Sequence, residues 1–394
     1  QYGQVSCRRS TAMNFTLHLG AGHISGGVFV FTILASVPVP QYEATVTNAE
    51  SQPTIPAAPP PAPWWRRLLF WMACTAGFLC RLLLILWATL AVHYSNLPWP
   101  WLRTVLALLV AGIGIWALWL ARNRRAFWIE AGAVVTVMIW WALIPARNDR
   151  DWKPEVSVMP RAIIEGDRVK LAGVRNFDYR TRTDFTVRHE EREVELSHLV
   201  GVDFFLSSWS DKPIAHTFVS FLFDNAPPLS ISIEARLEKG EKYSAIPSLF
   251  KQFELLYIVG DERDIVRVRT NYRNERVYLY HTHATPEGAR RLLLSYLEAM
   301  NRLTEKPEYY ALFSNNCTVN IDRHAHRDGK GLTYDPRLLI NGYADRFAYA
   351  KGILDTSVPF EVLRERSMIS EKAKAADQDA EFSKRIREGL VPVR

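Results

Sequence analysis

Residues 214–235 read IAHTFVSFLFDNAPPLSISIEA, and this stretch decides the architecture that we expect for the polar part of the chain. Two runs of apolar and β-branched residues flank the turn-forming residues 225–228. This pattern predicts a pair of antiparallel strands joined by a turn. His216 stands at the start of the first strand, and the return of the chain brings Glu234 or Arg236 close to it.

Further strands and helices extend this hairpin in both directions. The predicted strands are Val169–Val174, Val219–Phe223, Ser230–Ala235, Ile265–Thr270 and Arg276–Tyr280. Between Pro286 and Leu303 the apolar residues repeat with helical spacing, and Thr285 is a suitable N-cap. Strands and helices in separate blocks predict an α+β domain, which we place over residues 148–365.

Cys317 follows a polar run, Ser314-Asn315-Asn316, and precedes a segment with helical character. A thiol at a helix N-terminus gains from the unpaired N–H groups and from the helix dipole, both of which stabilise the thiolate. A nucleophilic cysteine needs such surroundings. A capping loop around a buried structural cysteine has the same local pattern, so the run alone leaves both interpretations open.

The His216 strand favours the catalytic interpretation. A lone histidine at the start of an apolar strand is more often structural, but a carboxylate on the returning strand would orient the imidazole and raise its basicity. We therefore predict Cys317 as a nucleophile, His216 as its base and Glu234 as the residue that holds the base. The alternative for Glu234 is a salt bridge with Arg236.

Metal and cofactor chemistry find little support. The chain has four cysteines, Cys7, Cys74, Cys80 and Cys317. Because a single one lies in the polar domain, the sequence predicts neither a disulfide framework nor a zinc site. Two His-x-His pairs, at 281–283 and 324–326, lack an acidic or cysteine ligand at useful spacing. A Gly-rich phosphate loop and a nucleophile elbow are also absent from the sequence, so we expect no cofactor.

Residues 63–147 are predicted to form a membrane anchor. Its three apolar segments are Leu68–Val92, Thr104–Ala121 and Phe127–Ala146. Each is long enough to cross a hydrocarbon core of roughly 30 Å. Two charged residues, Arg81 and Glu130, interrupt the segments, and we expect them to snorkel to an interface rather than to line a lipid path.

Charged and aromatic residues at the segment ends predict the orientation. Trp64, Trp65, Trp99 and Trp101 stand where interfacial aromatics belong. The arginines that mark the cytoplasmic side are Arg66, Arg67, Arg122, Arg124 and Arg125. We therefore expect a bacterial inner-membrane protein whose N-terminus is cytoplasmic and whose polar domain is periplasmic.

The two ends of the chain are expected to lie outside the catalytic domain. Residues 1–62 read as a tail and a Pro/Ala-rich linker, and residues 366–394 as a charged, solvated tail. The net charge is +7 and the isoelectric point is about 9.2. Because the arginines are spread without a basic helix, and much of the excess lies at membrane edges, we do not expect nucleic-acid binding.

Six segments, in order along the chain, carry a resemblance to a known family. They are Gly173–Arg180, Ile214–Thr217, Ser232–Arg236, Lys239–Tyr243, Asp261–Asp264 and Asn315–Thr318. Together they resemble the Lnb N-terminal periplasmic domain family. The order of His-bearing strand, partner strand, helix and Asn-Asn-Cys-Thr is also similar to circularly permuted papain-like (NlpC-type) cysteine enzymes, in which histidine precedes cysteine.

The resemblance implies an acyl-thioester mechanism. In the Lnb-type lipoprotein N-acyltransferase, a cysteine takes an acyl chain and passes it to the amino group of a lipoprotein. Carried over to this chain, Cys317 attacks a lipid ester, His216 transfers the proton and Glu234 holds His216. Backbone N–H groups at the start of the Cys317 helix would stabilise the oxyanion. Membrane lipid and a lipoprotein N-terminus are the implied partners.

Candidates for the substrate cleft surround these residues. They are Asn315, Asn316 and Thr318 beside the thiol, and Asn176, Tyr179, Arg236, Glu241 and Tyr243 in the other resembling segments. We interpret Asp261–Asp264 as a solvated turn with surface salt bridges.

Two other functions compete with the acyltransferase. A cysteine hydrolase, an amidase or peptidase of envelope peptide or peptidoglycan, would use the same residues and let water resolve the thioester. A non-enzymatic membrane receptor or scaffold would need Cys317 only as a structural residue.

Overall fold

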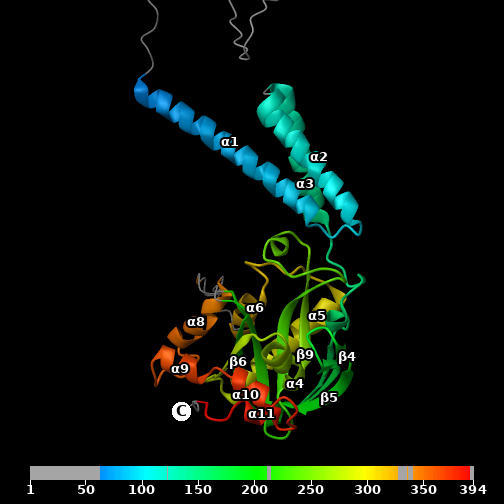
Figure 1. Ribbon diagram of the computed structural model, residues 1–394, viewed down its shortest axis with the longest axis vertical. Helices are drawn as coiled ribbons and strands as arrows, with labels where there is room; N and C mark the ends of the chain where they lie inside the picture. The colour runs from blue at the N-terminus through cyan, green and yellow to red at the C-terminus, as the bar shows by residue number, and fades with distance from the viewer. Residues whose placement is uncertain (1–62, 122, 211–213, 327–334, 336–339, 391–394) are drawn as a thin grey trace, which may run out of the picture. The chain divides into compact units, whose positions relative to one another are not determined.

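The computed structural model describes residues 63–121, 123–210, 214–326, 335 and 340–390 (Figure 1). The expected N-terminal tail and linker, residues 1–62, lie outside the described residues. Within the described part, three long helices precede a domain of strands and shorter helices. The predicted class, an α+β domain that follows three candidate membrane helices, is confirmed.

The three predicted spans are helical, and each is long and apolar enough to cross a membrane. They are α1 (Trp64–His93), α2 (Pro100–Ile115), which continues as a π-helical turn η1 (Trp116–Ala121), and α3 (Arg124–Leu143). Local chemistry sets where two of them start. Pro100 occupies the first turn of α2, and the Asn123 side chain accepts a 2.8 Å hydrogen bond from the backbone N–H of Ala126 in α3.

The two charged residues inside the spans bind each other. The Arg81 guanidinium hydrogen-bonds both carboxylate oxygens of Glu130, and Glu130 is buried between the helices. An unpaired carboxylate would be costly in hydrocarbon, whereas a paired one is tolerated. The expected snorkelling of these side chains is therefore wrong, because each satisfies the other at the helix contact.

An eight-stranded sheet organises the domain. Its strands are β1 (Arg161–Glu165), β2 (Arg168–Arg175), β5 (His189–Glu195), β6 (Leu199–Ser208), β7 (His216–Phe223), β8 (Leu229–Arg236), β9 (Glu254–Gly260) and β10 (Arg276–His281). The order is β1-β2-β9-β8-β7-β6-β10, and β5 also pairs with β2. A separate pair is made by β3 (Asp178–Tyr179) and β4 (Phe185–Thr186).

Nearly every pairing in the large sheet is antiparallel, and the exception is the contact of β2 with β9. There Arg175 lies opposite Gly260. A Cβ atom at Gly260 would come within 2.8 Å of the Arg175 carbonyl oxygen, so only glycine allows this approach.

The 214–235 stretch forms the predicted hairpin of β7 and β8, in which Phe218 faces Ser232 and Phe221 faces Leu229. Side chains alternate between the two faces of a strand, so β7 serves two cores. Val219 and Phe221 belong to one buried cluster, and Phe218 belongs to another.

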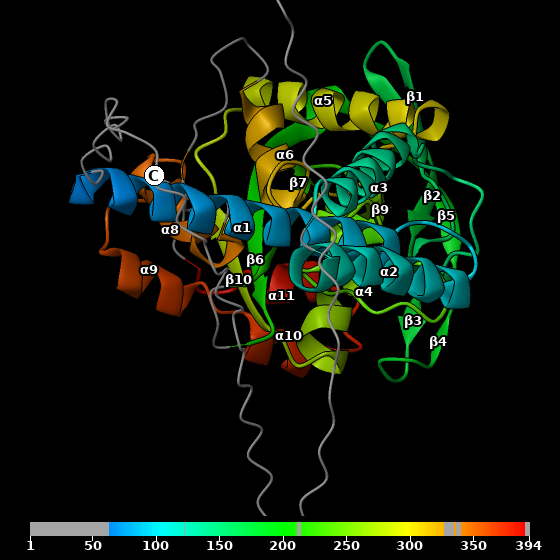
Figure 2. The same ribbon diagram turned by 90° about the horizontal axis from the view of Figure 1, so that it is seen from above.

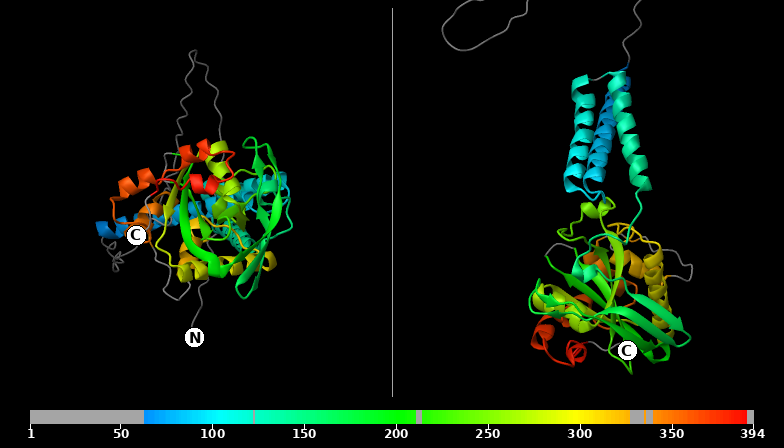
Figure 3. Two further views of the ribbon diagram at one scale, coloured as in Figure 1. Left: turned by 90° about the horizontal axis from the view of Figure 1, so that it is seen from below. Right: turned by 90° about the vertical axis from the view of Figure 1, so that its right-hand side faces the viewer.

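Helices cover both faces of the sheet (Figure 2). One face carries α5 (Pro286–Glu305) and α6 (Cys317–Ala325). The other carries α4 (Glu262–Arg267), the π-helical turn η5 (Val268–Tyr272), α10 (Ser370–Ala375) and α11 (Phe382–Arg385). The left view of Figure 3 shows α5 and the red C-terminal helices on opposite sides of the strands. The remaining elements are η2 (Pro154–Val156), η3 (Leu196–His198), η4 (Pro247–Leu249), η6 (Asn341–Tyr343), α8 (Ala344–Ala350) and α9 (Phe360–Arg366).

The predicted strand at Ile265–Thr270 is wrong, because these residues continue α4 into η5. The carboxylate of Asp261 accepts a 2.9 Å hydrogen bond from the backbone N–H of Arg263 and starts the helix. β-branched residues dominate this stretch, and its burial against the sheet outweighs their preference for strands.

The expectation of a solvated tail at 366–394 is also wrong for the residues described. Ile369, Phe382 and Ile386 are each fully buried in the core that contains Phe218. Arg387 binds Glu262 at 2.6 Å and Asp203 at 2.8 Å, which fastens the segment to α4 and β6. The apolar residues of this segment are widely spaced among lysines and glutamates, so the sequence pattern does not indicate a face that packs in a core.

A core role for this segment predicts that Phe382→Ala lowers the free energy of unfolding by about 3–5 kcal/mol, as is typical of a buried phenylalanine. Thermal unfolding of the detergent-solubilised protein measures the change. Lys384→Ala, two residues further along and exposed, is the matched control. Equal stability of both variants and the wild type would mean that the segment does not pack as described.

Candidate functional site

Cys317 is the first residue of helix α6 and is almost completely buried, with 1% of its surface exposed. Asn316 caps the helix, because its side-chain oxygen accepts a 2.9 Å hydrogen bond from the backbone N–H of Val319. The Asn316 amide group in turn donates to the carbonyl of Leu312. The polar run before the cysteine therefore builds the cap that places the sulfur at the positive end of the helix.

The thiol has an acidic pKa. Burial alone would raise it, but a hydrogen bond and the charge of His216, together with hydrogen bonds from Thr217, outweigh burial and lower the pKa of Cys317 to about 6. At neutral pH the sulfur is therefore mainly a thiolate, the form that acts as a nucleophile. Strand β7 supplies both partners, since His216 and Thr217 are its first two residues.

His216 reaches its carboxylate through a serine. The Nε2 atom of His216 lies 2.7 Å from Ser232 Oγ, and Ser232 Oγ donates a 2.8 Å hydrogen bond to Glu234 Oε1. The direct separation of His216 Nε2 and Glu234 Oε1 is 3.8 Å. The Ser232 hydroxyl has one proton, which it donates to Glu234. Its oxygen therefore accepts the hydrogen bond from the Nε2–H group of His216. The other ring nitrogen of His216, Nδ1, is then left for the sulfur of Cys317.

Glu234 is held as a carboxylate by a buried arginine. Arg269 Nη2 lies 2.6 Å from Glu234 Oε1, and its side chain is 3% exposed. Burial would raise the pKa of Glu234, but the charges of Arg269 and His216 hold it well below its ordinary value. Arg269 also lies over the ring of Phe218, 4.9 Å from its centroid, so the guanidinium is packed as well as paired.

Arg236 does not take part in this constellation, and the predicted alternative of a Glu234–Arg236 salt bridge is wrong. Its guanidinium donates to the carbonyls of Val156 at 2.9 Å and Ser157 at 2.7 Å, and it stacks 4.2 Å from the ring centroid of Trp152. Arg236 is thus a structural residue that ties the chain before β1 to the end of β8.

The residues next to Cys317 shape the loop and one wall of the site. The Thr318 hydroxyl lies 3.0 Å from that of Thr217 and 3.8 Å from the Cys317 sulfur. Asn315 donates a 2.9 Å hydrogen bond to the carbonyl of Tyr309 and accepts one from Asn320. Asn315 therefore supports the loop, whereas Thr318 lies against Thr217 and the Cys317 sulfur.

Two of the other cleft candidates, Tyr243 and Glu241, lie in the loop between β8 and β9. The ring of Tyr243 lies edge-on to that of Tyr310, with centroids 6.2 Å apart, and desolvation of its hydroxyl raises the pKa of Tyr243. Glu241 accepts hydrogen bonds from the backbone of Glu238 and from Gln252, so it holds the same loop together.

Asn176 and Tyr179 lie elsewhere. Asn176 donates to Glu190, and Tyr179 packs in a separate aromatic cluster with Phe177 and Phe185. Their structural contacts support β2 and the β3–β4 pair rather than the surroundings of the thiol.

Four contributors escaped the sequence analysis: Thr217, Ser232, Arg269 and Asn341. The Asn341 side-chain amide lies 3.5 Å from the Cys317 sulfur and belongs to the short helix η6. The period-2 pattern of β8 puts Ser232 on the same face as Glu234, which is a signal that the sequence did contain. Arg269 and Asn341 carry no such signal, because long-range packing brings them to the site.

The run Asp261–Asp264 is a buried ionic network instead of the expected solvated turn. Asp264 binds Arg175 at 2.8 Å, Glu262 binds Arg387 at 2.6 Å, and Asp261 binds Arg192 at 3.0 Å. All three carboxylates are almost fully buried. Each finds an arginine from a different part of the chain, and this network fixes α4 and thereby the start of η5, where Arg269 lies.

The His-x-His pairs have other partners. Buried His324 lies between Ser295 at 2.7 Å and Tyr257 at 2.6 Å, and His281 binds Asp203 at 2.6 Å. Among the residues that the structure describes, no group of three His, Cys, Asp or Glu side chains has an arrangement suited to a metal ion.

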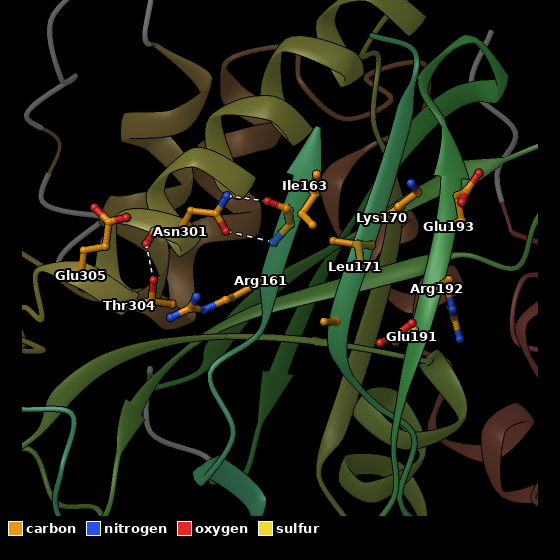
Figure 4. Close-up of a pocket in the computed structure, with 12 residues that line it drawn as sticks. Arg161, Ile163, Lys170, Leu171, Glu191, Arg192, Glu193, Asn301, Thr304 and Glu305 are labelled. Carbon is orange, nitrogen blue, oxygen red and sulfur yellow. Dashed lines mark hydrogen bonds between the residues drawn. The ribbon is translucent and has the colours of Figure 1, made fainter. Parts of the chain in front are cut away.

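A hollow on the described surface lies away from these residues, between β1, β2, β5 and the end of α5 (Figure 4). Arg161, Lys170 and Glu193 line it with charges of both signs. Asn301 closes one side by hydrogen bonds to both backbone groups of Ala162, at 2.9 and 2.7 Å. This hollow contains none of the predicted site residues.

Residues 185–345 match the family described as the Lnb N-terminal periplasmic domain. This span contains Cys317, His216, Ser232 and Glu234. The match confirms the family predicted from the sequence. No curated protein and no solved structure matches the chain.

The thiol's surroundings predict a pH profile. Alkylation of Cys317 by iodoacetamide needs the thiolate, so its rate should rise with pH and reach half of its plateau near pH 6, as the lowered pKa requires. His216→Gln removes the charged hydrogen-bond partner, and the midpoint should move toward or above the ordinary value of about 8.5.

Mass spectrometry of the alkylated peptide measures this rate in a chain with Cys7, Cys74 and Cys80 changed to serine. A wild-type midpoint as high as that of His216→Gln would show that His216 does not influence the thiol.

Proposed function

Taking residues 185–345 as an Lnb N-terminal periplasmic domain, we propose that this protein is a membrane-anchored cysteine acyltransferase that forms an acyl-thioester on Cys317. One observation carries the proposal: the Cys317 thiol lies at the N-terminus of helix α6, where His216 acts on it and lowers its pKa to about 6. A purely structural buried cysteine has the opposite tendency, because burial raises the pKa of a thiol. The surroundings of Cys317 therefore lower the pKa of its thiol although the thiol is buried.

The first half-reaction is attack on an ester. The Cys317 thiolate forms a bond to the carbonyl carbon of a lipid ester, and the carbonyl electron pair becomes an oxyanion. Its stabilisation falls to backbone N–H groups in the first turn of α6 and to the side-chain amide of Asn341, which lies 3.5 Å from the sulfur. Collapse of the intermediate breaks the C–O bond, and protonated His216 gives its proton to the leaving alcohol.

The second half-reaction transfers the acyl group. The amino group of a lipoprotein N-terminus attacks the thioester, His216 takes a proton from this nitrogen, and the C–S bond breaks as the amide forms. Water in place of the amine would give a hydrolase. The near-complete burial of the sulfur favours transfer, because a site closed to solvent limits the competing water.

His216 carries a positive charge beside the thiolate until the alcohol leaves, and again once it has taken the proton of the amine, and the residues behind it support that charge. Ser232 accepts from Nε2–H and passes the bond to Glu234, whose carboxylate is kept ionised by Arg269. This arrangement fixes the ring and its tautomer, the task of the third residue in a catalytic triad. Here that task is divided between Ser232 and Glu234.

The proposed orientation puts the N-terminal side of α1 in the cytoplasm. The arginine pairs 66–67 and 124–125 start α1 and α3, ends that lie on one side when successive helices cross in alternate directions. Arg150 follows the last span on the other side, but it is paired with Glu238 at 2.9 Å and Glu254 at 2.6 Å. Its charge is thus balanced within the domain and does not oppose the orientation.

Acylation of the protein in membranes tests the proposed function. Cells grown with an alkyne fatty acid should yield a wild-type protein that carries a label cleaved by hydroxylamine, whereas Cys317→Ala should carry none. His216→Ala should slow label formation strongly, by about 10²- to 10⁴-fold if it acts as the general base.

The other outcomes distinguish the competing functions. A chain without acyl label whose Cys317 is still selectively alkylated near pH 6 would be a hydrolase of a different substrate. A chain with neither property would have a structural Cys317, as expected of a receptor or scaffold.

The relay predicts a specific effect of Ser232. In Ser232→Ala, His216 loses the acceptor for Nε2–H, so the rate of acyl-enzyme formation should fall by about 10²-fold, within the range of general acid–base effects. Ser230→Ala is the matched control, because Ser230 is equally buried two residues earlier on the same strand and pairs with Ser220.

The pH profile of Cys317 alkylation supplies a readout that a merely structural role would leave unchanged, since its midpoint should rise in Ser232→Ala and stay constant in Ser230→Ala. Equal rates and midpoints in the two variants would contradict the relay.

A further inference from the structure

The loop between β8 and β9, residues 237–253, exposes large apolar side chains. Tyr243, Ile246 and Leu249 are 41%, 53% and 40% exposed. Phe313 is 57% exposed on a neighbouring segment, which joins the loop through a hydrogen bond from the backbone N–H of Leu312 to the carbonyl of Ser248. We name these four residues, Tyr243, Ile246, Leu249 and Phe313, the apolar lip.

The same loop is bound to the ends of two membrane helices. Phe250 is buried in a cluster with residues of the last turns of α1, and its ring stacks on Tyr94 at 6.0 Å between centroids. Lys251 donates to the carbonyls of Trp141 at 2.7 Å and Ile144 at 3.4 Å, at the end of α3. Phe250 and Lys251 of this loop therefore contact the membrane helices, whereas the side chains of the apolar lip stay exposed.

These attachments set the level of the lip relative to a bilayer. α1 ends at His93 and α3 ends at Leu143, and both ends mark the boundary between hydrocarbon and headgroups on the domain side. A loop fastened to both ends lies at this boundary. Apolar side chains placed there gain free energy by entering the boundary region to a depth of about 5–10 Å.

The lip is also continuous with the surroundings of the thiol. The ring of Tyr243 lies edge-on to that of Tyr310, with centroids 6.2 Å apart, and Tyr310 is buried in the same cluster as Cys317. Tyr243 further contacts Phe253, with ring centroids 5.9 Å apart. One side chain of the lip thus extends from the membrane boundary to the wall of the candidate site.

We propose that the apolar lip inserts into the surface of the lipid bilayer on the domain side, and that a hydrocarbon chain passes along it from the membrane to Cys317. The insertion is independent of any reaction at Cys317. The passage of a chain rests on the proposed function. The bilayer is favoured as the occupant because the lip continues directly from the outer ends of α1 and α3.

Fluorescence quenching by brominated lipid tests the insertion. Ile246→Cys is introduced into the full chain with its four native cysteines replaced, labelled with bimane, and placed in nanodiscs of phosphatidylcholine and phosphatidylglycerol. Bromination of the acyl chains should cause a loss of bimane fluorescence. Val200→Cys is the matched control, because Val200 is 47% exposed and lies beside Phe223, at the end of the β6–β7 ladder opposite to His216.

An unquenched label at position 246, or equal quenching at 246 and 200, would overturn the insertion. A blue-shifted label that brominated lipid does not quench would mean that a protein surface covers the lip instead.

The passage of a hydrocarbon chain is tested separately, in the chain with its native cysteines. Ile246→Asp should reduce acyl labelling of Cys317 and leave its alkylation by iodoacetamide unchanged, whereas Val200→Asp should alter neither. Quenching without acyl labelling in the wild type would retain the insertion and reject the proposed function. Acyl labelling without quenching would retain the function and reject the lip.

Discussion

The antiparallel pairing of β7 with β8 is the constraint on which the candidate site depends. In its register Phe218 faces Ser232, and the same alternation puts Glu234 opposite His216. Because side chains alternate along a strand, a slip of one residue would move Ser232 and Glu234 to the other face of the sheet. Helix α6 then packs against the same two strands and carries Cys317 to the first residues of β7. The position of the sulfur beside His216 therefore depends on both the register of the sheet and the cap of helix α6.

Charge compensation explains why these groups tolerate burial. From the sulfur outward the charges alternate in sign, from the thiolate of Cys317 to His216, then to Glu234 and Arg269. Each charge would be costly in a protein interior by itself, and each lies beside an opposite one or reaches it through the hydroxyl of Ser232. Removing an inner member should therefore affect the sulfur as well, since the groups are coupled.

Local patterns in the sequence were sufficient to predict the spans, the hairpin and the cap of α6, because each of these features depends on residues that are neighbours in the chain. The predictions failed where contacts with distant parts of the chain determine the local structure. The β-branched run at 265–270 became helical under a capping aspartate, and the sparse apolar residues near Phe382 proved to complete a core. Arg269 and Asn341 reach the site only through the tertiary fold. Ser232 is an intermediate case, since strand alternation places it but does not distinguish it from other serines on the strand.

The burial of residues 369–386 has a consequence for biogenesis. These residues follow every strand that the structure describes, yet they cover the face of the sheet that contains Phe205 and Phe218. During synthesis and export that aromatic face emerges well before its cover arrives. Exposed apolar surface of this kind promotes aggregation of a folding intermediate. Rapid docking of the last helices would therefore shorten the time during which the nascent domain exposes this face.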